Sequence, residues 1–184
     1  MGRVELTREA ILDSAATVLS ANPRASLADI ASEAKIGRAT LHRHFSSRSE
    51  LVLTLVRASI RAIDEACANI DYGGQAAIQS LRDTVEAIVP LGARYSFVAH
   101  QGEALDDDVI RAETARQLAS ARQLAEALKA EGSVGVDVPT AWVVATVDAL
   151  IYAGWLEVHR GAVAANDVAE LIIRTITQGL GPAA

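Results

Sequence analysis

The chain has 184 residues, 51% of them apolar, and a formal net charge of −6 at pH 7. This length and apolar content allow one or two domains with a buried core. A single cysteine, Cys67, excludes an internal disulfide and offers no metal-ligand spacing, so we expect neither a metal nor another cofactor. No apolar run approaches eighteen residues and no N-terminal signal core is visible, which predicts a cytoplasmic protein that does not enter a membrane.

The charge is distributed unevenly along the chain. Residues 1–50 hold seven Lys or Arg against six Asp or Glu, whereas the remaining residues hold ten against seventeen. From Lys35 to Arg48 there are four basic residues and no acidic one. Because charges beyond about 10 Å are largely screened at physiological salt, this local basic segment matters more to an approaching phosphate than the acidic total does.

Helical periodicity runs through nearly the whole chain, and strand signals are absent. The first predicted helix extends from about Thr7 to Ala21, where Asn22-Pro23 ends it. Ser26 is a good N-cap for a second helix, and Asp29, three residues on, completes a capping box. This second helix has one apolar face, formed by Leu27, Ile30, Ala31 and Ala34.

The next segment predicts a tight turn followed by a short basic helix. Lys35-Ile36-Gly37 interrupts the helical pattern, and Gly37 can cap the helix that follows. Leu41 and Phe45, four residues apart, point inward on that helix. The outward face carries Arg38, Thr40, His42, Arg43 and His44. A short helix that is apolar on one side and basic on the other fits a DNA groove; the alternative is an ordinary solvated face.

The remainder of the chain predicts six more helices. A second capping box, from Ser47 to Glu50, opens a long helix that we expect to reach Tyr72, before Gly73-Gly74 ends it. Five further helices are predicted at about 75–89, 91–101, 108–131, 139–160 and 166–178, with Pro90 between the first two. The expected fold is therefore all-α with about nine helices, divided into domains at 1–48 and 49–184.

The last two predicted helices are apolar on more than one side. A helix on the surface of a monomer normally buries one stripe, so a second apolar face requires further cover. This pattern predicts a four-helix interface between two copies of the chain; the alternative is a helix buried wholly within one subunit. The candidate interface residues are Trp142, Ala149, Leu156, Leu171, Ile172, Thr175 and Ile176.

Three groups of residues carry a family resemblance: Ile30-Ala31 in the first motif helix, Thr40-Leu41 with His44-Phe45 in the second, and Arg48 with Glu50-Leu51 at the start of the long helix. With them, residues 7–55 resemble the DNA-binding domain of TetR-family transcriptional regulators; beyond residue 55 the resemblance is one of helix number and length. It implies a three-helix helix-turn-helix domain joined by a long helix to a C-terminal helical domain for ligand binding and dimerisation. The function implied is that of a ligand-responsive regulator, by default a repressor, which binds a palindromic operator as a homodimer and is released by a small, largely apolar effector.

The chain departs from the family pattern at three positions. Lys35 occupies the turn position where the family usually has Gly, and a left-handed conformation there would cost Lys of order 1 kcal/mol. Gly37 replaces the usual Ser or Thr that caps the recognition helix, and His42 replaces the usual Tyr. Both replacements remove a hydroxyl from the expected DNA surface.

The resemblance places the second motif helix in the major groove, with its N-terminal half nearest the bases. Arg38 is the leading candidate for a base contact, because a guanidinium can bind guanine O6 and N7 together. Arg48 and the N-terminus of the long helix can both hold phosphate. The expected DNA-contacting residues are Ser26, Lys35, Gly37, Arg38, Ala39, Thr40, His42, Arg43, His44 and Arg48.

The effector pocket is expected among the helices that follow Gly74, near the interruption at Pro90. Its candidate lining residues, each of which could equally be an ordinary core or interface residue, are Tyr95, Phe97, His100, Glu103, Trp142 and Tyr152. The sequence has no G-x-S-x-G, Walker or H-E-x-x-H motif, so an enzyme is not expected. Two alternatives remain: a helical small-molecule carrier with a non-functional DNA motif, and an enzyme on an all-helical dimer. Salt-dependent binding to duplex DNA separates the regulator from both.

Overall fold

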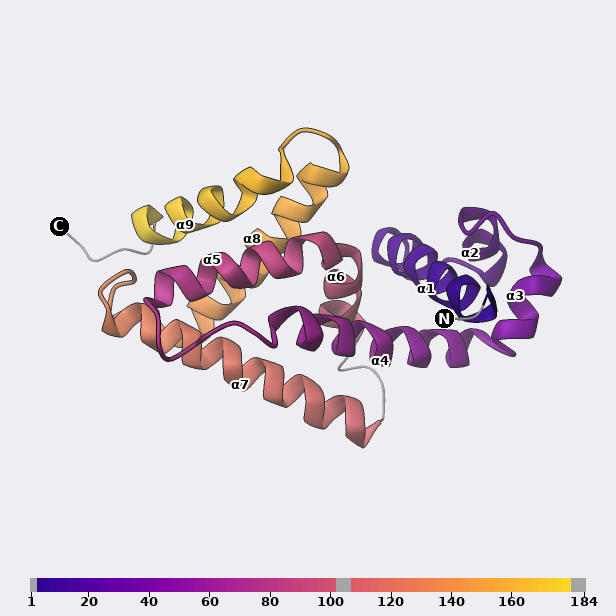
Figure 1. Cartoon of the computed structure of the whole chain (residues 1–184), viewed down its shortest axis with the longest axis horizontal. Helices are drawn as coiled ribbons and strands as arrows, with labels where there is room; N and C mark the ends of the chain where they lie inside the picture. Colours follow the sequence, from indigo (N-terminus) through magenta and orange to yellow (C-terminus); the bar gives the residue numbers. More distant parts are fainter. Residues whose placement is uncertain (1–2, 102–106, 180–184) are drawn as a thin grey trace. The chain divides into compact units, whose positions relative to one another are not determined.

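The computed structural model describes residues 3–101 and 107–179, and every regular element in these ranges is helical. This confirms the all-α prediction. The nine α-helices of the described residues are α1 (Arg3–Ala21), α2 (Leu27–Glu33), α3 (Arg38–His44), α4 (Arg48–Cys67), α5 (Ala77–Ile88), α6 (Gly92–Gln101), α7 (Asp108–Ala130), α8 (Thr140–His159) and α9 (Val168–Gly179) (Figure 1). Single turns of 3-10 helix, Val89–Leu91 and Ala165–Asp167, precede α6 and α9.

The chain packs as two compact units. The described residues up to Arg61, together with those from Ala93 to Arg111, form the first unit. Those from Ala62 to Gly92 and from Ala112 onward form the second. α6 therefore joins α1–α3 and most of α4 in the first unit, an association that sequence periodicity did not indicate. The functional division at residue 48 stays a prediction.

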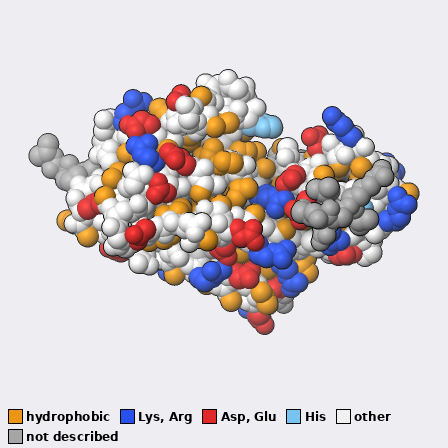
Figure 2. Space-filling view, in the orientation of Figure 1, with side chains coloured by type: hydrophobic (Ala, Val, Ile, Leu, Met, Phe, Trp, Pro, Cys, Tyr) orange, Lys and Arg blue, Asp and Glu red, His pale blue; other side chains and the backbone are white. Residues whose placement is uncertain are grey.

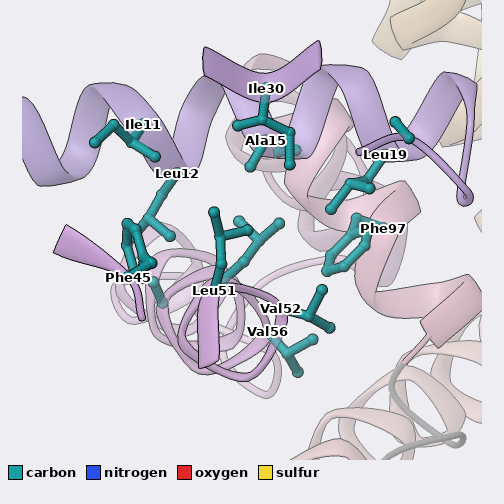
Figure 3. Packing of buried hydrophobic residues seen from close by; sticks show 14 of the residues in the cluster. Ile11, Leu12, Ala15, Leu19, Ile30, Phe45, Leu51, Val52, Val56 and Phe97 are labelled. Carbon is teal, nitrogen blue, oxygen red and sulfur yellow. The ribbon is translucent and has the colours of Figure 1, made fainter. Parts of the chain in front are cut away.

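The first unit has a continuous hydrophobic core. Leu12 and Leu19 of α1, Ile30 of α2 and Leu51 of α4 are at most 1% exposed (Figure 3). Phe97 of α6 joins this core, and Figure 3 shows its ring directed toward α1 and the start of α4. Burying each of these side chains contributes about 1.5–3 kcal/mol, so α2 and α3 are held on a rigid base.

In the second unit, α9 packs along both α5 and α8 (Figure 1). Ile172 and Ile176 supply the buried face of α9, and Leu81 and Val85 that of α5. The Glu131 carboxylate accepts the free N–H groups of the first residues of α5, at 2.7 and 2.9 Å, which fixes the start of that helix.

The long helix α4 ends earlier than predicted, at Cys67 rather than near Tyr72. The Asp71 carboxylate accepts hydrogen bonds from the N–H groups of Gly73 and Gly74, at 3.0 and 2.7 Å. Such a local bond gives the backbone an alternative to the helix. The helix therefore ends before the glycines that the sequence analysis used to mark its end.

α8 carries more apolar side chains than the described part of the chain buries. By length and composition alone, this helix could cross a membrane, and 17% of that stretch is buried. The core helix of a soluble protein passes the same test. Trp142 of α8 is 60% exposed, and Figure 2 shows apolar side chains on the surface over α5 and α8. Much apolar surface of the second unit is therefore left exposed by the described residues.

Candidate nucleic-acid interface

α2 begins with the capping box that the sequence predicts. The Ser26 hydroxyl accepts a hydrogen bond from the Asp29 N–H, and the Asp29 carboxylate accepts one from the Ser26 N–H at 2.8 Å. The bonds from the Ser26 backbone and hydroxyl lower the pKa of Asp29 below its ordinary value. The charged form of this carboxyl is therefore the one that holds the start of α2.

The turn between α2 and α3 confirms the left-handed conformation expected at Lys35, whose φ is 53°. The Lys35 N–H donates to the Ser32 carbonyl at 3.1 Å, and the Ile36 N–H donates to the Ala31 carbonyl at 3.0 Å. These two bonds define a Schellman motif, which satisfies the last carbonyls of a helix. The motif normally has Gly at the left-handed position, so Lys35 holds the turn with backbone strain.

α3 presents a polar outer face and an apolar inner one. Leu41 and Phe45 are 1% and 0% exposed, as their spacing predicts. The predicted DNA-contacting residues of this segment lie on the outside: Lys35, Gly37, Arg38, Ala39, His42 and Arg43 are exposed, and Thr40 and His44 are half-buried. Arg43 donates to the Thr40 hydroxyl at 3.0 Å, which ties two neighbouring side chains of that face. Figure 2 shows Lys and Arg side chains on the surface at α3.

Arg48 has a packing role that the sequence did not indicate. Its guanidinium donates to the Pro23 carbonyl at 2.7 Å and to the Ala25 carbonyl at 3.3 Å. These bonds attach the start of α4 to the loop between α1 and α2. The predicted phosphate contact stays a prediction, because a guanidinium has five N–H donors and these bonds use two of its nitrogens.

The start of α4 is capped differently from the prediction. The Ser47 hydroxyl accepts a bond from the Glu50 N–H at 3.1 Å, as in a capping box. The Glu50 carboxylate, however, accepts from the hydroxyl and the N–H of Ser46, at 2.6 and 2.8 Å, rather than from the Ser47 N–H. Those two bonds lower the pKa of Glu50. The carboxylate reaches one residue further back because the loop presents both donors of Ser46 to it.

Arg8 was missed by the sequence analysis. It lies on α1, where it donates to the His44 carbonyl at 3.0 Å, and its guanidinium carbon is 4.4 Å from the centre of the Phe45 ring. No motif spacing indicates this contact, because the two residues that it joins are 36 positions apart. The last turn of α3 is thus held from outside the helix-turn-helix.

The residues predicted to line an effector pocket are not brought into one described cavity. Phe97 is in the core of the first unit. Tyr95 is half-buried and belongs to the same unit. Trp142 is exposed on α8, and the half-buried Tyr152 lies beside the Trp155 ring, with ring centres 5.8 Å apart. The side chain of His100 and the whole of Glu103 lie outside the described residues. An open hollow of about 390 Å³ beside the α8–α9 turn is lined by none of the residues predicted to form the effector pocket.

The predicted dimer-interface residues fall on two different faces. Trp142 and Leu171 are 60% and 38% exposed. Ala149 and Thr175 are also exposed, and Leu156 is half-buried. Ile172 and Ile176 are instead 3% and 0% exposed, against α5 and α8 of the same chain. These two isoleucines are a correction: the inward face of α9 requires them, so they leave the predicted interface.

A helix-turn-helix that exposes a basic second helix is the architecture of DNA-binding regulators. Residues 11–55, which contain this motif, match the family model described as bacterial regulatory proteins, tetR family. This part of the chain is therefore similar to the DNA-binding region of the TetR family of transcriptional regulators.

Two known proteins are similar to this chain over nearly its whole length. The HTH-type transcriptional repressor LfrR of Mycolicibacterium smegmatis is 29% identical over 179 residues, which cover 97% of this chain and 93% of that protein. The crystal structure of LfrR from Mycobacterium smegmatis has a TM-score of 0.74 at 28% identity, covering 98% of this chain and 99% of that one. LfrR in complex with proflavine gives a TM-score of 0.72 at 28% identity, with 99% and 100% covered. The ketosteroid regulator KstR2 of Mycobacterium tuberculosis, at 18% identity and a TM-score of 0.70 over 96% of this chain and 95% of that one, shares the fold.

Proposed function

We propose that this protein is a repressor that binds a palindromic operator as a homodimer and is released by a small, largely apolar effector. The exposed basic face of α3, on a helix fixed at both ends, is the observation that carries the DNA-binding part. Repression is supported by the likeness to LfrR, which is named a repressor. Two-fold symmetry in the protein is matched by a palindrome in the DNA, since each recognition helix reads one half-site.

The effector proposal rests on the second unit. LfrR has been crystallised with proflavine, a planar aromatic compound. In this chain three rings follow one another along α8: Tyr152 and Trp155 have centres 5.8 Å apart, and Trp155 and His159 have centres 5.7 Å apart with planes 24° from parallel. Rings of this kind favour offset stacking with other aromatic groups. We therefore propose a planar aromatic effector as the first class to examine.

Operator binding is tested by fluorescence anisotropy on labelled duplexes from the DNA beside this protein's gene, and from a selected random library if those fail. One palindrome should be bound with two chains per site and with an affinity that falls steeply as salt rises. Arg38→Ala should reduce the preference for that palindrome about 5- to 150-fold, which corresponds to the 1–3 kcal/mol of a bidentate base contact. Arg122→Ala removes the same charge from an exposed site on α7 and should change nothing. Failure on every duplex would leave the carrier as the better hypothesis.

The phosphate role of Arg48 needs a separate control. Arg48→Ala should weaken all duplexes alike and flatten the salt dependence. The Arg48 side chain also holds the loop at Pro23 and Ala25. The thermal unfolding of the Arg48→Ala variant is therefore measured together with its DNA binding. Equal loss of sequence preference in Arg38→Ala and Arg48→Ala would contradict the division between base and phosphate contacts.

Effector binding is tested with proflavine itself, first in the absence of DNA because a flat dye also stacks in a duplex. Trp142 and Trp155, both in α8, report binding through quenching of their fluorescence. A saturable quench that Trp155→Leu abolishes would support stacking on that ring. Quenching that Trp142→Leu alone removes would contradict it. Release of labelled operator is then measured against a free-duplex control.

A further inference from the structure

α3 is a short helix whose two ends are held by different means. Its N-terminal end follows the Schellman turn at Lys35, while its C-terminal end stops at Phe45, which has an extended backbone (φ −139°, ψ 113°). The last carbonyls of a helix have no intrahelical donors. The His44 carbonyl is one of these, and it accepts a hydrogen bond from the guanidinium of Arg8 at 3.0 Å. A bond from a charged donor is about twice as strong as a neutral one.

The same guanidinium makes a second contact with the end of α3. It lies 4.4 Å from the centre of the Phe45 ring, within the range of a favourable cation–π interaction. The Phe45 ring is fully buried, so it is a fixed anchor. One half-buried side chain of α1 therefore holds both the last carbonyl of α3 and the residue that ends it. Arg43 and His44, which belong to the predicted DNA surface, project from this turn.

We propose that Arg8 is a positioning residue for DNA recognition, which fixes the C-terminal turn of α3 and thereby its fit to the operator. The inference rests on the proposed function, because it concerns how α3 meets bases. Removing the guanidinium leaves Leu41 and Phe45 buried, since their burial depends on the whole core of the first unit. α3 should then remain packed on the core of the first unit, while the orientation of its last turn is no longer fixed. Base contacts require accurate placement of the helix, whereas phosphate contacts tolerate more variation.

The test compares Arg8→Met with the native chain on operator and on unrelated duplex of the same length. Arg8→Met keeps a long side chain and removes both the charge and the donors. We expect the preference for operator to fall about tenfold, in line with the loss of one charged hydrogen bond, with little change on unrelated duplex. Arg8→Lys retains a cation and should recover part of the preference. Arg61→Met removes an exposed charge from the same unit and should have no effect.

Two outcomes of this binding comparison would overturn the proposal. If Arg8 only contacts phosphate, Arg8→Met weakens both duplexes equally and lowers the magnitude of the salt slope by about one. If its role is only structural, thermal unfolding shifts and both affinities fall with the folded fraction.

Amide hydrogen exchange without DNA separates this proposal from the proposed function. The Phe45 N–H donates to the Leu41 carbonyl at 2.9 Å, and it should exchange faster in Arg8→Met than in the native chain. A native chain that binds no duplex would contradict the proposed function alone. Unchanged exchange at Phe45 would contradict the positioning role in either case.

Discussion

Lys35 is the residue at which the helix-turn-helix carries backbone strain. Its φ of 53° belongs to the region that glycine adopts freely and that costs other residues about 1–2 kcal/mol. Lys35→Gly should therefore raise the free energy of unfolding, by up to about 1 kcal/mol once the greater freedom of glycine in the unfolded chain is counted. Chemical denaturation measures the change.

The matched control for this position is Lys35→Ala. It removes the same charge but keeps the Cβ atom that causes the strain, so its stability should not rise. Equal stabilisation by Gly and Ala would show that the charge, and not the left-handed backbone, is responsible. Both variants remove the Lys35 charge and should lose its predicted DNA contact to the same extent. Any difference in DNA binding between them then reports the shape of the turn.

At Gly37 stability should rise when glycine is replaced, whereas at Lys35 it should rise when glycine is introduced. Gly37 is the N-cap of α3 with φ −73° and ψ 149°, an extended conformation that any residue adopts, and it supplies no side-chain bond to the helix. A Cβ atom added there would meet nothing within 4 Å. Gly37→Ser should therefore stabilise the chain by about 0.5–1 kcal/mol, through a new cap and a less flexible unfolded state. Gly37→Ala lacks the hydroxyl and should gain less; a larger gain for Ala would contradict the capping argument.

At the scale of elements, local signals predicted what local interactions determine. The cap at Ser26, the left-handed turn at Lys35 and the inward pair Leu41 and Phe45 depend on neighbours within about five positions, and the structure confirms each. Contacts between residues far apart in the chain were not predictable from periodicity. The position of Phe97 in the first unit is one such case, because an aromatic on an amphipathic helix suits a pocket and a core equally.

The carboxylate caps of α2 and α4 predict that the stability of the folded chain depends on pH. Bonds from Ser26 lower the pKa of Asp29, and bonds from Ser46 lower that of Glu50. A carboxyl whose pKa is lower in the folded state stabilises fully above its unfolded pKa, and this contribution is lost as the pH falls through the folded pKa. The melting temperature should therefore drop as the pH falls from about 5 to about 3.

The double variant Asp29→Asn with Glu50→Gln removes both titrating groups. It should be less stable than the native chain at pH 7, and the difference should shrink as the pH falls, because the native caps are then progressively protonated. Asp137→Asn, at an exposed site in the turn before α8, is the control and should keep the native pH dependence. A double variant with the full native acid dependence would assign that dependence to other carboxyls.

The whole molecule divides its charge and its apolar surface between the two units. The basic segment from Lys35 to Arg48 belongs to the first unit, whereas the uncovered apolar helix α8 belongs to the second. An acidic total is therefore compatible with a DNA-binding surface, since screening makes the field near α3 a local one. The exposed apolar surface of the second unit predicts that a second protein chain covers it.

Homodimerisation is the prediction that belongs to this scale. Trp142 and Leu171 are 60% and 38% exposed in the single chain, and a two-fold interface would bury each of them twice. Replacing both with Asp removes that apolar burial, worth about 1.5–3 kcal/mol per side chain, and places charges in the interface. The dissociation constant of the dimer should rise by at least about 100-fold.

Sedimentation velocity measures that change directly. The native chain should sediment as a dimer, and the Trp142→Asp, Leu171→Asp double variant as a monomer with unchanged helix content. Leu118→Asp alters a comparably exposed leucine, 42% exposed on α7, and should leave the dimer intact. The monomeric variant should also lose tight operator binding, because a single α3 reads only one half-site. If the double variant remains dimeric while Leu118→Asp dissociates, the interface lies on α7 instead of on α8 and α9.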